Sequence, residues 1–169
     1  HFLNKRPGLS VSLIFKLLAI INLIKPSVIH THHIGPLIYG GIACRLKRIP
    51  YLIHTEHDAW HLKNNKRCLV QKLIIKIVRP IIVADARFVA KKIKQYIPSI
   101  KPFIIHNGVD VDRYYPMEKS SARTTLNLPQ NVLLIGCAAR LHPVKGHDVL
   151  IKAINKLPGH VHLALAGTG

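Results

Sequence analysis

Two cations in one predicted loop are the first candidates for chemistry in this sequence. Arg140 and Lys145 lie between an apolar run at residues 132–136 and residues 149–154, whose apolar positions have helical spacing. Open α/β sheets bind ligands at the carboxyl ends of their strands, where amides of the next helix point outward. The fork of an Arg and the point charge of a Lys both suit phosphate oxygens, and Gly146 lets a ligand approach the backbone. The loop predicts a phosphate site, with a solvated basic loop as the alternative.

Histidines at the ends of two further apolar runs are the second candidates. They are His30, His32 and His33 in the first run and His54 and His57 in the second. Because neighbouring parallel strands end at the same crevice, we expect the two groups to meet. Glu56 and Asp58 would complete a zinc site in one interpretation, but their support is loose and we expect no metal. Packing or surface roles for single histidines are the other interpretation.

Composition limits the partners without choosing one. The chain has 169 residues, of which 49% are hydrophobic, so it can bury a core and is not a disordered chain. Its formal net charge of +18 favours nucleotide phosphates, acidic lipid headgroups or nucleic acid. The three cysteines are odd in number and lack metal-ligand spacing, which predicts small buried side chains in a reducing cytosol. They are Cys44, Cys68 and Cys137.

Strand and helix patterns alternate around these candidates. The predicted strands are residues 27–33, 51–58, 81–84 and 103–106, and the predicted helices are residues 9–24, 35–47, 64–79 and 86–97. This alternation predicts βαβ units with right-handed crossovers and a parallel sheet covered on both faces. Asp85, after the third strand, is expected to cap the helix that follows.

Two of the predicted helices carry a further interpretation. Residues 9–24 are very apolar but short for a membrane span and contain Lys16, which predicts a helix packed on the sheet, with a membrane-contacting helix as the alternative. In residues 64–79 the predicted buried stripe consists of Leu69, Leu73, Ile74 and Ile77. The basic residues of this helix would then face solvent or an anionic membrane.

Residues 111–130 interrupt the alternation with prolines and no long apolar run. We therefore place a domain boundary between residues 117 and 118. Residues 1–117 would form most of one Rossmann-like domain and residues 118–169 the beginning of a second. The second would contain a short helix at residues 122–126, a strand from residue 132, a helix from residue 148 and a strand at residues 161–165.

The same strings resemble family 4 (group 1) glycosyltransferases. Residues 138–150 read Ala-Ala-Arg-Leu-His-Pro-Val-Lys-Gly-His-Asp-Val-Leu, and residues 106–110 read His-Asn-Gly-Val-Asp. The resemblance runs from about residue 28 to the end of the chain. It implies the α/β GT-B fold, in which an acceptor-side and a donor-binding Rossmann-like domain face each other. The family's first strand, its Gly-rich loop and its late pair of glutamates are expected to lie outside residues 1–169.

The resemblance also implies roles for individual residues. In the family an Arg and a Lys hold the diphosphate of the donor, and the matching residues here are Arg140 and Lys145. A His that lies beside the transferred sugar in the family corresponds to His32. The remaining donor-side residues would be Gly146, Gly167 and Gly169. The acceptor side would hold His33, Glu56, His57, Asn107 and Gly108. From the residues alone, Asn107 and Gly108 predict a tight turn.

The implied function is transfer of a hexosyl-type sugar, with retention, from a nucleotide-diphosphate sugar to a saccharide or lipid-linked acceptor. It needs no metal or other cofactor and would serve the synthesis of cell-surface polysaccharide or lipid-linked saccharide. The implied location is the cytoplasm, with peripheral contact at the inner face of an anionic membrane as an open alternative. The alternatives are another GT-B enzyme, such as a nucleotide-sugar epimerase or a phosphorylase, and a non-catalytic basic module for nucleic acid or membranes. Only charge supports the last, so nucleic acid is not an expected partner.

Overall fold

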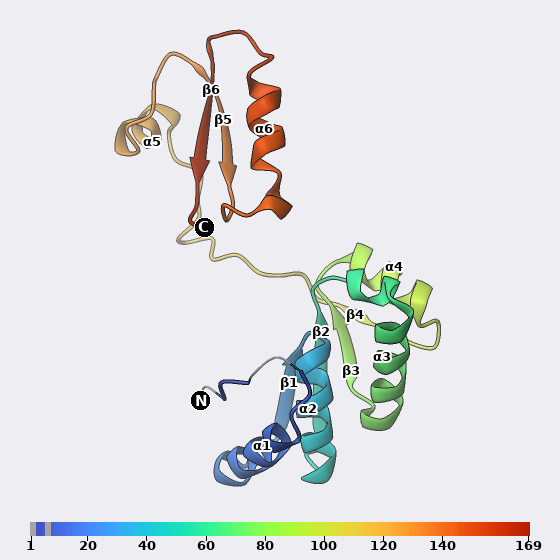
Figure 1. Cartoon of the computed structure of the whole chain (residues 1–169). Coiled ribbons are helices and arrows are strands. Elements are labelled where there is room, and N and C mark those ends of the chain that lie inside the picture. The colour runs from blue at the N-terminus through green and yellow to red at the C-terminus, as the bar shows by residue number, and fades with distance from the viewer. Residues whose placement is uncertain (1–2, 6–7) are drawn as a thin grey trace. The chain divides into compact units, whose positions relative to one another are not determined.

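The computed structural model describes residues 3–5 and 8–169 and divides the chain into two compact units (Figure 1). The first unit is His1–Gly108 and the second is Val109–Gly169. The division precedes the predicted boundary at residues 117 and 118, because residues 109–118 are exposed and contain no helix or strand.

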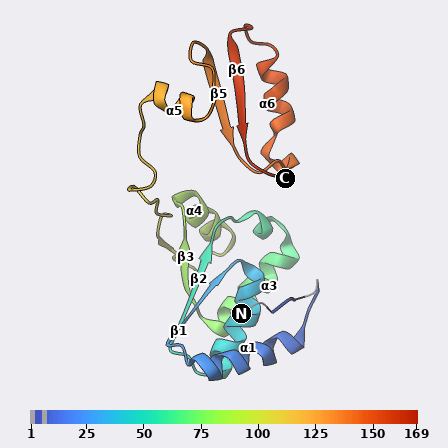
Figure 2. The ribbon, with the colours of Figure 1, turned by 90° about the vertical axis from the view of Figure 1, so that its left-hand side faces the viewer.

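The first unit is a parallel sheet whose strands are joined through helices. In spatial order the strands are β1 (Val28–His32), β2 (Tyr51–Glu56), β3 (Ile81–Ala84) and β4 (Phe103–Ile104). The helices are α1 (Val11–Ile24), α2 (Ile34–Leu46), α3 (Asn65–Val78), α4 (Arg87–Tyr96) and the 3-10 helix η1 (Trp60–Lys63). Figures 1 and 2 show β1, β2 and β3 side by side. The predicted βαβ alternation is thereby confirmed.

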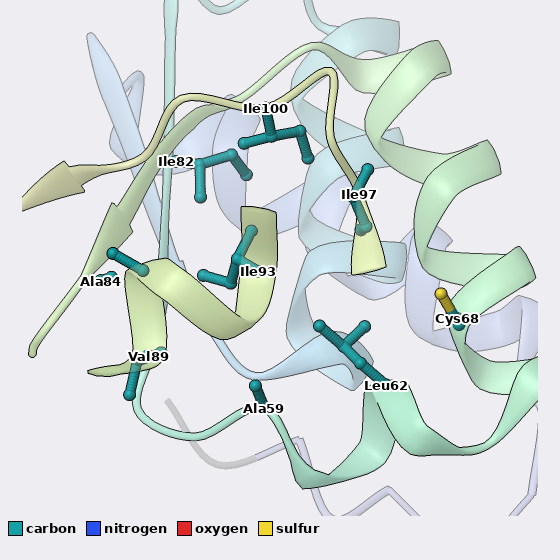
Figure 3. Close-up of a cluster of buried hydrophobic side chains, with 10 residues drawn as sticks. Ala59, Leu62, Cys68, Ile82, Ala84, Val89, Ile93, Ile97 and Ile100 are labelled. Carbon is teal, nitrogen blue, oxygen red and sulfur yellow. The ribbon is translucent and has the colours of Figure 1, made fainter. Parts of the chain in front are cut away.

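Helices bury one face of this sheet. Figure 3 shows Val89 and Ile93 of α4 gathered with Ile82 and Ala84 of β3 in the larger hydrophobic cluster. A second cluster joins α2, β2 and α3 and consists of Leu37, Cys44, Leu52, Ile74 and Val78. Cys44 and Cys68 are buried free thiols in these clusters, as expected of small apolar side chains.

Glycines let α2 lie close to its neighbours. A Cβ on Gly40 would lie 3.0 Å from Cγ2 of Thr31 in β1, and a Cβ on Gly41 would lie 3.0 Å from Cγ2 of Val78 in α3. Both distances are tighter than ordinary van der Waals contact. The two glycines inside a helical pattern therefore have a packing role.

The opposite face of the sheet differs from the prediction that helices cover both faces. Ile53, Ile81, Phe103 and Ile105 line an open hollow there, and Phe103 is 64% exposed. Residues 3–5 and 8–108 supply no helix over them. The open face includes the same side of β1 that carries His30 and His32, because side chains alternate along a strand.

Two helices pack differently from their predicted faces. α3 buries Cys68, Gln71, Ile74 and Val78, whereas Leu69, Leu73 and Ile77 are exposed. The buried face is rotated from the predicted stripe because Gln71 turns inward to donate to Glu56. α1 packs against α2 rather than on the sheet. Among the described residues, no helix combines the length and the apolar character that a membrane crossing requires.

The second unit is smaller. It contains α5 (Lys119–Thr125), β5 (Leu133–Ala138), the 3-10 helix η2 (Pro143–Lys145), α6 (His147–Ile154) and β6 (Val161–Ala166). β5 and β6 pair in parallel, with α6 against β6. β5 continues to Ala138, beyond its predicted end, and Cys137 is only half-buried in it. The strand–loop–helix order predicted around Arg140 and Lys145 is confirmed.

Candidate functional site

Polar residues follow each strand of the first unit at its carboxyl end. His32 ends β1 and His33 follows it. His57 follows β2, Asp85 follows β3, and His106 and Asn107 follow β4. The strands are parallel and adjacent in that order, so all of these residues share one edge of the sheet. The expected meeting of the two histidine groups is confirmed by the hydrogen bond between His32 and His57.

A continuous hydrogen-bonded chain runs along this edge. Nδ1 of His32 lies 2.8 Å from Nε2 of His57, and Nδ1 of His57 lies 3.1 Å from Oδ2 of Asp85. The rings of His32 and His57 are stacked, with centroids 5.1 Å apart. The ring of His33 lies 5.3 Å from that of His57. The ends of three neighbouring strands, β1, β2 and β3, thus contribute His32, His57 and Asp85 to one hydrogen-bonded series.

Asp85 is held in place from several sides. Its backbone oxygen lies 3.1 Å from Nδ1 of His106, and its Oδ2 accepts a longer hydrogen bond of 3.5 Å from Nδ2 of Asn107. Its backbone N–H donates to the carbonyl of Glu56. Its Oδ1 is buried and has no hydrogen-bond partner within the described part of the chain.

The predicted capping role of Asp85 is wrong. The N-cap of α4 is Ala86, and no side chain donates to or accepts from the first turn there. The carboxylate instead faces His57, because the backbone turns at the end of β3 before the helix begins. Sequence reasoning missed this residue, although a polar residue after each of four parallel strands was a signal for it.

The electrostatic surroundings of His32 favour its neutral form. Partial burial lowers the pKa of His32 below 6.5, and neighbouring histidines lower it further. These neighbours are His30, His57, His33 and His54. A neutral imidazole retains one lone pair, so at neutral pH His32 can accept a hydrogen bond.

The chain turns sharply after His32. His33 has a φ of 63°, in a region that side chains other than glycine rarely adopt. This turn starts α2 directly after the strand. Strained backbone of this kind gathers at functional sites, where the surrounding structure holds it.

A cavity of about 530 Å³ adjoins the hydrogen-bonded series of polar residues. Its polar end is lined by His32, His57, His106, Asn107 and Gly108, and its apolar end by residues of the open sheet face. The structure thus brings together the predicted site residues His32, His57, Asn107 and Gly108, with His33 beside them. A hydroxyl-rich ligand would find hydrogen-bonding groups at one end and apolar surface at the other.

Glu56 differs from its expected position on the acceptor side. It is 1% exposed, and its Oε1 lies 2.9 Å from Nε2 of His54 and accepts from Nε2 of Gln71. Strand alternation places His54 and Glu56 on the helix-covered face, opposite to His32. These residues form a buried polar network rather than a ligand surface.

The second candidate lies in the second unit, on the loop between β5 and α6. Arg140 and Lys145 are exposed, and neither side chain has a hydrogen bond or ion pair with any residue that the structure describes. Gly146 has a φ of 66° and ends η2, and Nδ1 of His142 accepts from the backbone of Val144. The loop has a defined turn, while its two cations remain available to an anion.

Glycines bring the end of β6 against this loop. The N–H of Leu141 donates to the carbonyl of Thr168 at 3.0 Å. A Cβ on Gly167 would lie 2.0 Å from the carbonyl oxygen of Ala139, and one on Gly169 would lie 2.4 Å from that of Leu141. Gly167 and Gly169 thus let the backbone on both sides of Arg140 approach closely, and their role at a ligand stays a prediction.

A metal centre is not assembled by the described residues. No group of at least three His, Cys, Asp or Glu among residues 3–5 and 8–169 is arranged to hold an ion. The His32–His57–Asp85 chain is occupied by its own hydrogen bonds.

The fold defines a class of protein. Its Rossmann-like parallel units have the α/β architecture of the GT-B type of glycosyltransferase. A glycosyltransferase from Rickettsia africae superposes on 99% of this chain with a TM-score of 0.70 and 22% identity, and 45% of that chain is covered.

Sequence comparison then identifies the family. Residues 1–113 match the model of Glycosyltransferase Family 4, and the chain belongs to this family. A D-inositol 3-phosphate glycosyltransferase from Streptomyces scabiei is 26% identical over 140 residues, which are 75% of this chain and 31% of the relative. The enzyme of that description from Mycobacterium avium is 36% identical over 64 residues, 38% of this chain and 15% of the relative. The chain therefore spans less than a third of these curated relatives.

Proposed function

We propose that the protein transfers a hexosyl-type sugar from a nucleotide-diphosphate sugar to a hydroxyl of a saccharide or lipid-linked acceptor, with retention at the anomeric carbon. The observation that carries this proposal is the pair of exposed cations Arg140 and Lys145 on a strand-to-helix loop of a family 4 glycosyltransferase, neither of which has an ion-pair partner among residues 3–5 and 8–169. Family membership supports the transfer, and the loop supports the diphosphate donor.

The chemistry of the donor explains the need for two cations. When the bond between the sugar and the diphosphate breaks, negative charge builds on the leaving oxygen. Arg140 can bind two phosphate oxygens through its guanidinium fork, and Lys145 adds a point charge. Both act without a metal ion, and neither has an acidic partner among the described residues to neutralise it.

The acceptor side of the proposed reaction is the cavity of the first unit. His32 and Asn107 line it and offer hydrogen bonds to hydroxyl groups. The net charge of +18 favours acceptors that carry phosphate or lie at an anionic surface. The relatives from Streptomyces scabiei and Mycobacterium avium are named for D-inositol 3-phosphate, a phosphate-bearing compound of this kind.

A binding experiment tests the donor site. Titration calorimetry with UDP, GDP, ADP and their sugars should show binding to the intact protein that Arg140→Ala with Lys145→Ala abolishes. Arg113→Ala with Lys152→Ala removes the same charge elsewhere in the second unit and should leave binding unchanged. Equal losses in both double variants would reduce the effect to net charge, and undiminished binding in the first would refute the assignment of Arg140 and Lys145.

We also propose that the protein contacts the anionic inner face of the cytoplasmic membrane. The exposed face of α3 carries Leu69, Leu73 and Ile77 between basic residues. The basic residues are Lys66, Arg67, Lys72, Lys76 and Arg79. Apolar side chains between cations are the composition of helices that lie in a lipid headgroup layer.

A further inference from the structure

We infer that Asp85 and His57 are positioning residues that fix the ring of His32 in one tautomer, with its Nε2 presented as a hydrogen-bond acceptor to a substrate hydroxyl. The inference deepens the proposed function and rests on it for the identity of the substrate. The state of the His32 ring, however, is a property of the protein alone and can be measured without any substrate.

The first step concerns the pair formed by His57 and Asp85. An ionised carboxylate can only accept hydrogen bonds, so Nδ1 of His57, 3.1 Å from Oδ2 of Asp85, must carry a proton. In a neutral ring the other nitrogen, Nε2, then has a lone pair. A carboxylate on Nδ1–H holds an imidazole in one tautomer and orientation in the same way in other proteins.

The second step passes this polarity to His32. In neutral His57, Nε2 can only accept, so Nδ1 of His32, 2.8 Å away, must donate. Neutral His32 therefore keeps its lone pair on Nε2. That atom has no hydrogen-bond partner among residues 3–5 and 8–169, and the ring of His32 lines the cavity.

The third step concerns the protonation of His32 at neutral pH. The titratable groups that face it are His30 on β1, His33 at the start of α2, His54 and His57 from β2 and its end, Asp85 after β3 and His106 after β4. Burial and the neighbouring histidines lower the pKa of His32, which favours the neutral ring. Nε2 of His30 bonds to Oγ1 of Thr55 at 2.8 Å, and Nδ1 of His32 is hydrogen-bonded to His57.

The carboxylate of Asp85 sets the direction of donation along the hydrogen bonds from His32 through His57 to Asp85. Without the carboxylate, no other hydrogen bond to His57 among the described residues requires Nδ1 to carry the proton. The bond between the two histidines can then reverse, so that Nε2 of His57 donates to Nδ1 of His32. His32 would then carry its proton on Nε2 and would donate to, rather than accept from, a substrate hydroxyl. Asp85 thus controls a group that it does not touch.

Nitrogen-15 spectra of the histidine rings test the inference in the intact protein at pH 7.5. We expect the wild type to show His32 and His57 protonated on Nδ1 and unprotonated on Nε2. Asp85→Ala should move the proton of His32 to Nε2. Asp58→Ala, which removes an acidic residue that makes no hydrogen bond to His32, His57 or Asp85, should leave both rings unchanged. A wild-type His32 with its proton on Nε2 would overturn the inference, and this measurement does not depend on how a variant folds.

Kinetics give the second arm of the test. Asp85→Ala should lower kcat by up to about 10⁴-fold, the effect seen when a catalytic histidine loses the carboxylate that fixes its tautomer, with donor affinity unchanged. An unchanged kcat together with an unchanged His32 tautomer would refute the positioning role. A wild-type protein that turns over no nucleotide sugar would refute the proposed function, while the ring spectra would still decide the inference about Asp85.

Discussion

Gly167 and Ala139 approach each other so closely that a Cβ on Gly167 would lie 2.0 Å from the carbonyl oxygen of Ala139. No side chain fits there, because the atom in the way belongs to the backbone rather than to a flexible side chain. The contact joins the end of β6 to the residue that precedes Arg140. Gly167 is therefore a residue that places the donor loop.

Replacing Gly167 with Ala should separate these two segments. We expect the free energy of unfolding of the second unit to fall by about 1–3 kcal/mol, the usual cost of overpacking. Binding of nucleotide sugar should weaken because Arg140 is displaced, as measured by calorimetry beside urea unfolding. Gly159→Ala is the control, since a Cβ at Gly159 meets nothing within 4 Å. Equal effects of the two variants would contradict the role of the contact.

The pH dependence of stability should report on His32. Because the pKa of His32 in the folded chain is lower than 6.5, the unfolded chain binds more protons in the window just below pH 6.5. The contribution of His32 to the free energy of unfolding therefore falls as pH decreases through this window and is fully present above it. Urea unfolding between pH 5 and 8 should show a shallower dependence for His32→Gln than for the wild type. An identical dependence would mean that the surroundings of His32 do not disfavour its charge.

The buried network around Glu56 separates structural from functional roles. Glu56→Ala removes the acceptor of two hydrogen bonds, from Gln71 and at His54, inside a site that water does not reach. We expect a loss of about 2–4 kcal/mol of unfolding free energy, since partners would be left buried and unpaired. Under conditions where the variant remains folded, its nucleotide-sugar affinity should equal that of the wild type. If the variant had normal stability and lost only its affinity for the acceptor, Glu56 would belong to the acceptor site instead.

The sequence predicted the order of the elements because each strand and helix leaves a local pattern of apolar residues. It also predicted that His32 and His57 meet, since parallel strands end at one edge. The side of the sheet that each side chain faces was harder to predict, because a shift of one position along a strand moves a side chain to the opposite face. Glu56 and His57 are neighbours in the sequence, yet one is buried in a network and the other lines the cavity.

Tertiary contacts account for the remaining differences. An Asp directly before a helix is usually expected to cap that helix. The carboxylate of Asp85 instead bonds to His57, which follows the neighbouring strand. In α3 the polar Gln71 is buried because Glu56 lies opposite, which rotates Leu69 and Leu73 to the surface. Neither partner is close in the sequence, so no local pattern could reveal the pairing.

The rotated face of α3 leads to the last prediction, which concerns membranes. Leu69→Ser with Leu73→Ser should reduce flotation of the intact protein with vesicles that contain anionic lipid, because both side chains are exposed and would lose their burial in the headgroup layer. The loss should be about 1.5–3 kcal/mol of binding free energy for each leucine that the lipid fully buries. Val149→Ser with Ile151→Ser removes comparable exposed apolar surface from the second unit and should leave flotation unchanged. Binding should also weaken as salt rises, since the basic residues beside Leu69 and Leu73 act through screened attraction. Equal flotation of both double variants and the wild type would exclude α3 as the contact, and equal flotation with purely neutral vesicles would exclude attraction to anionic lipid.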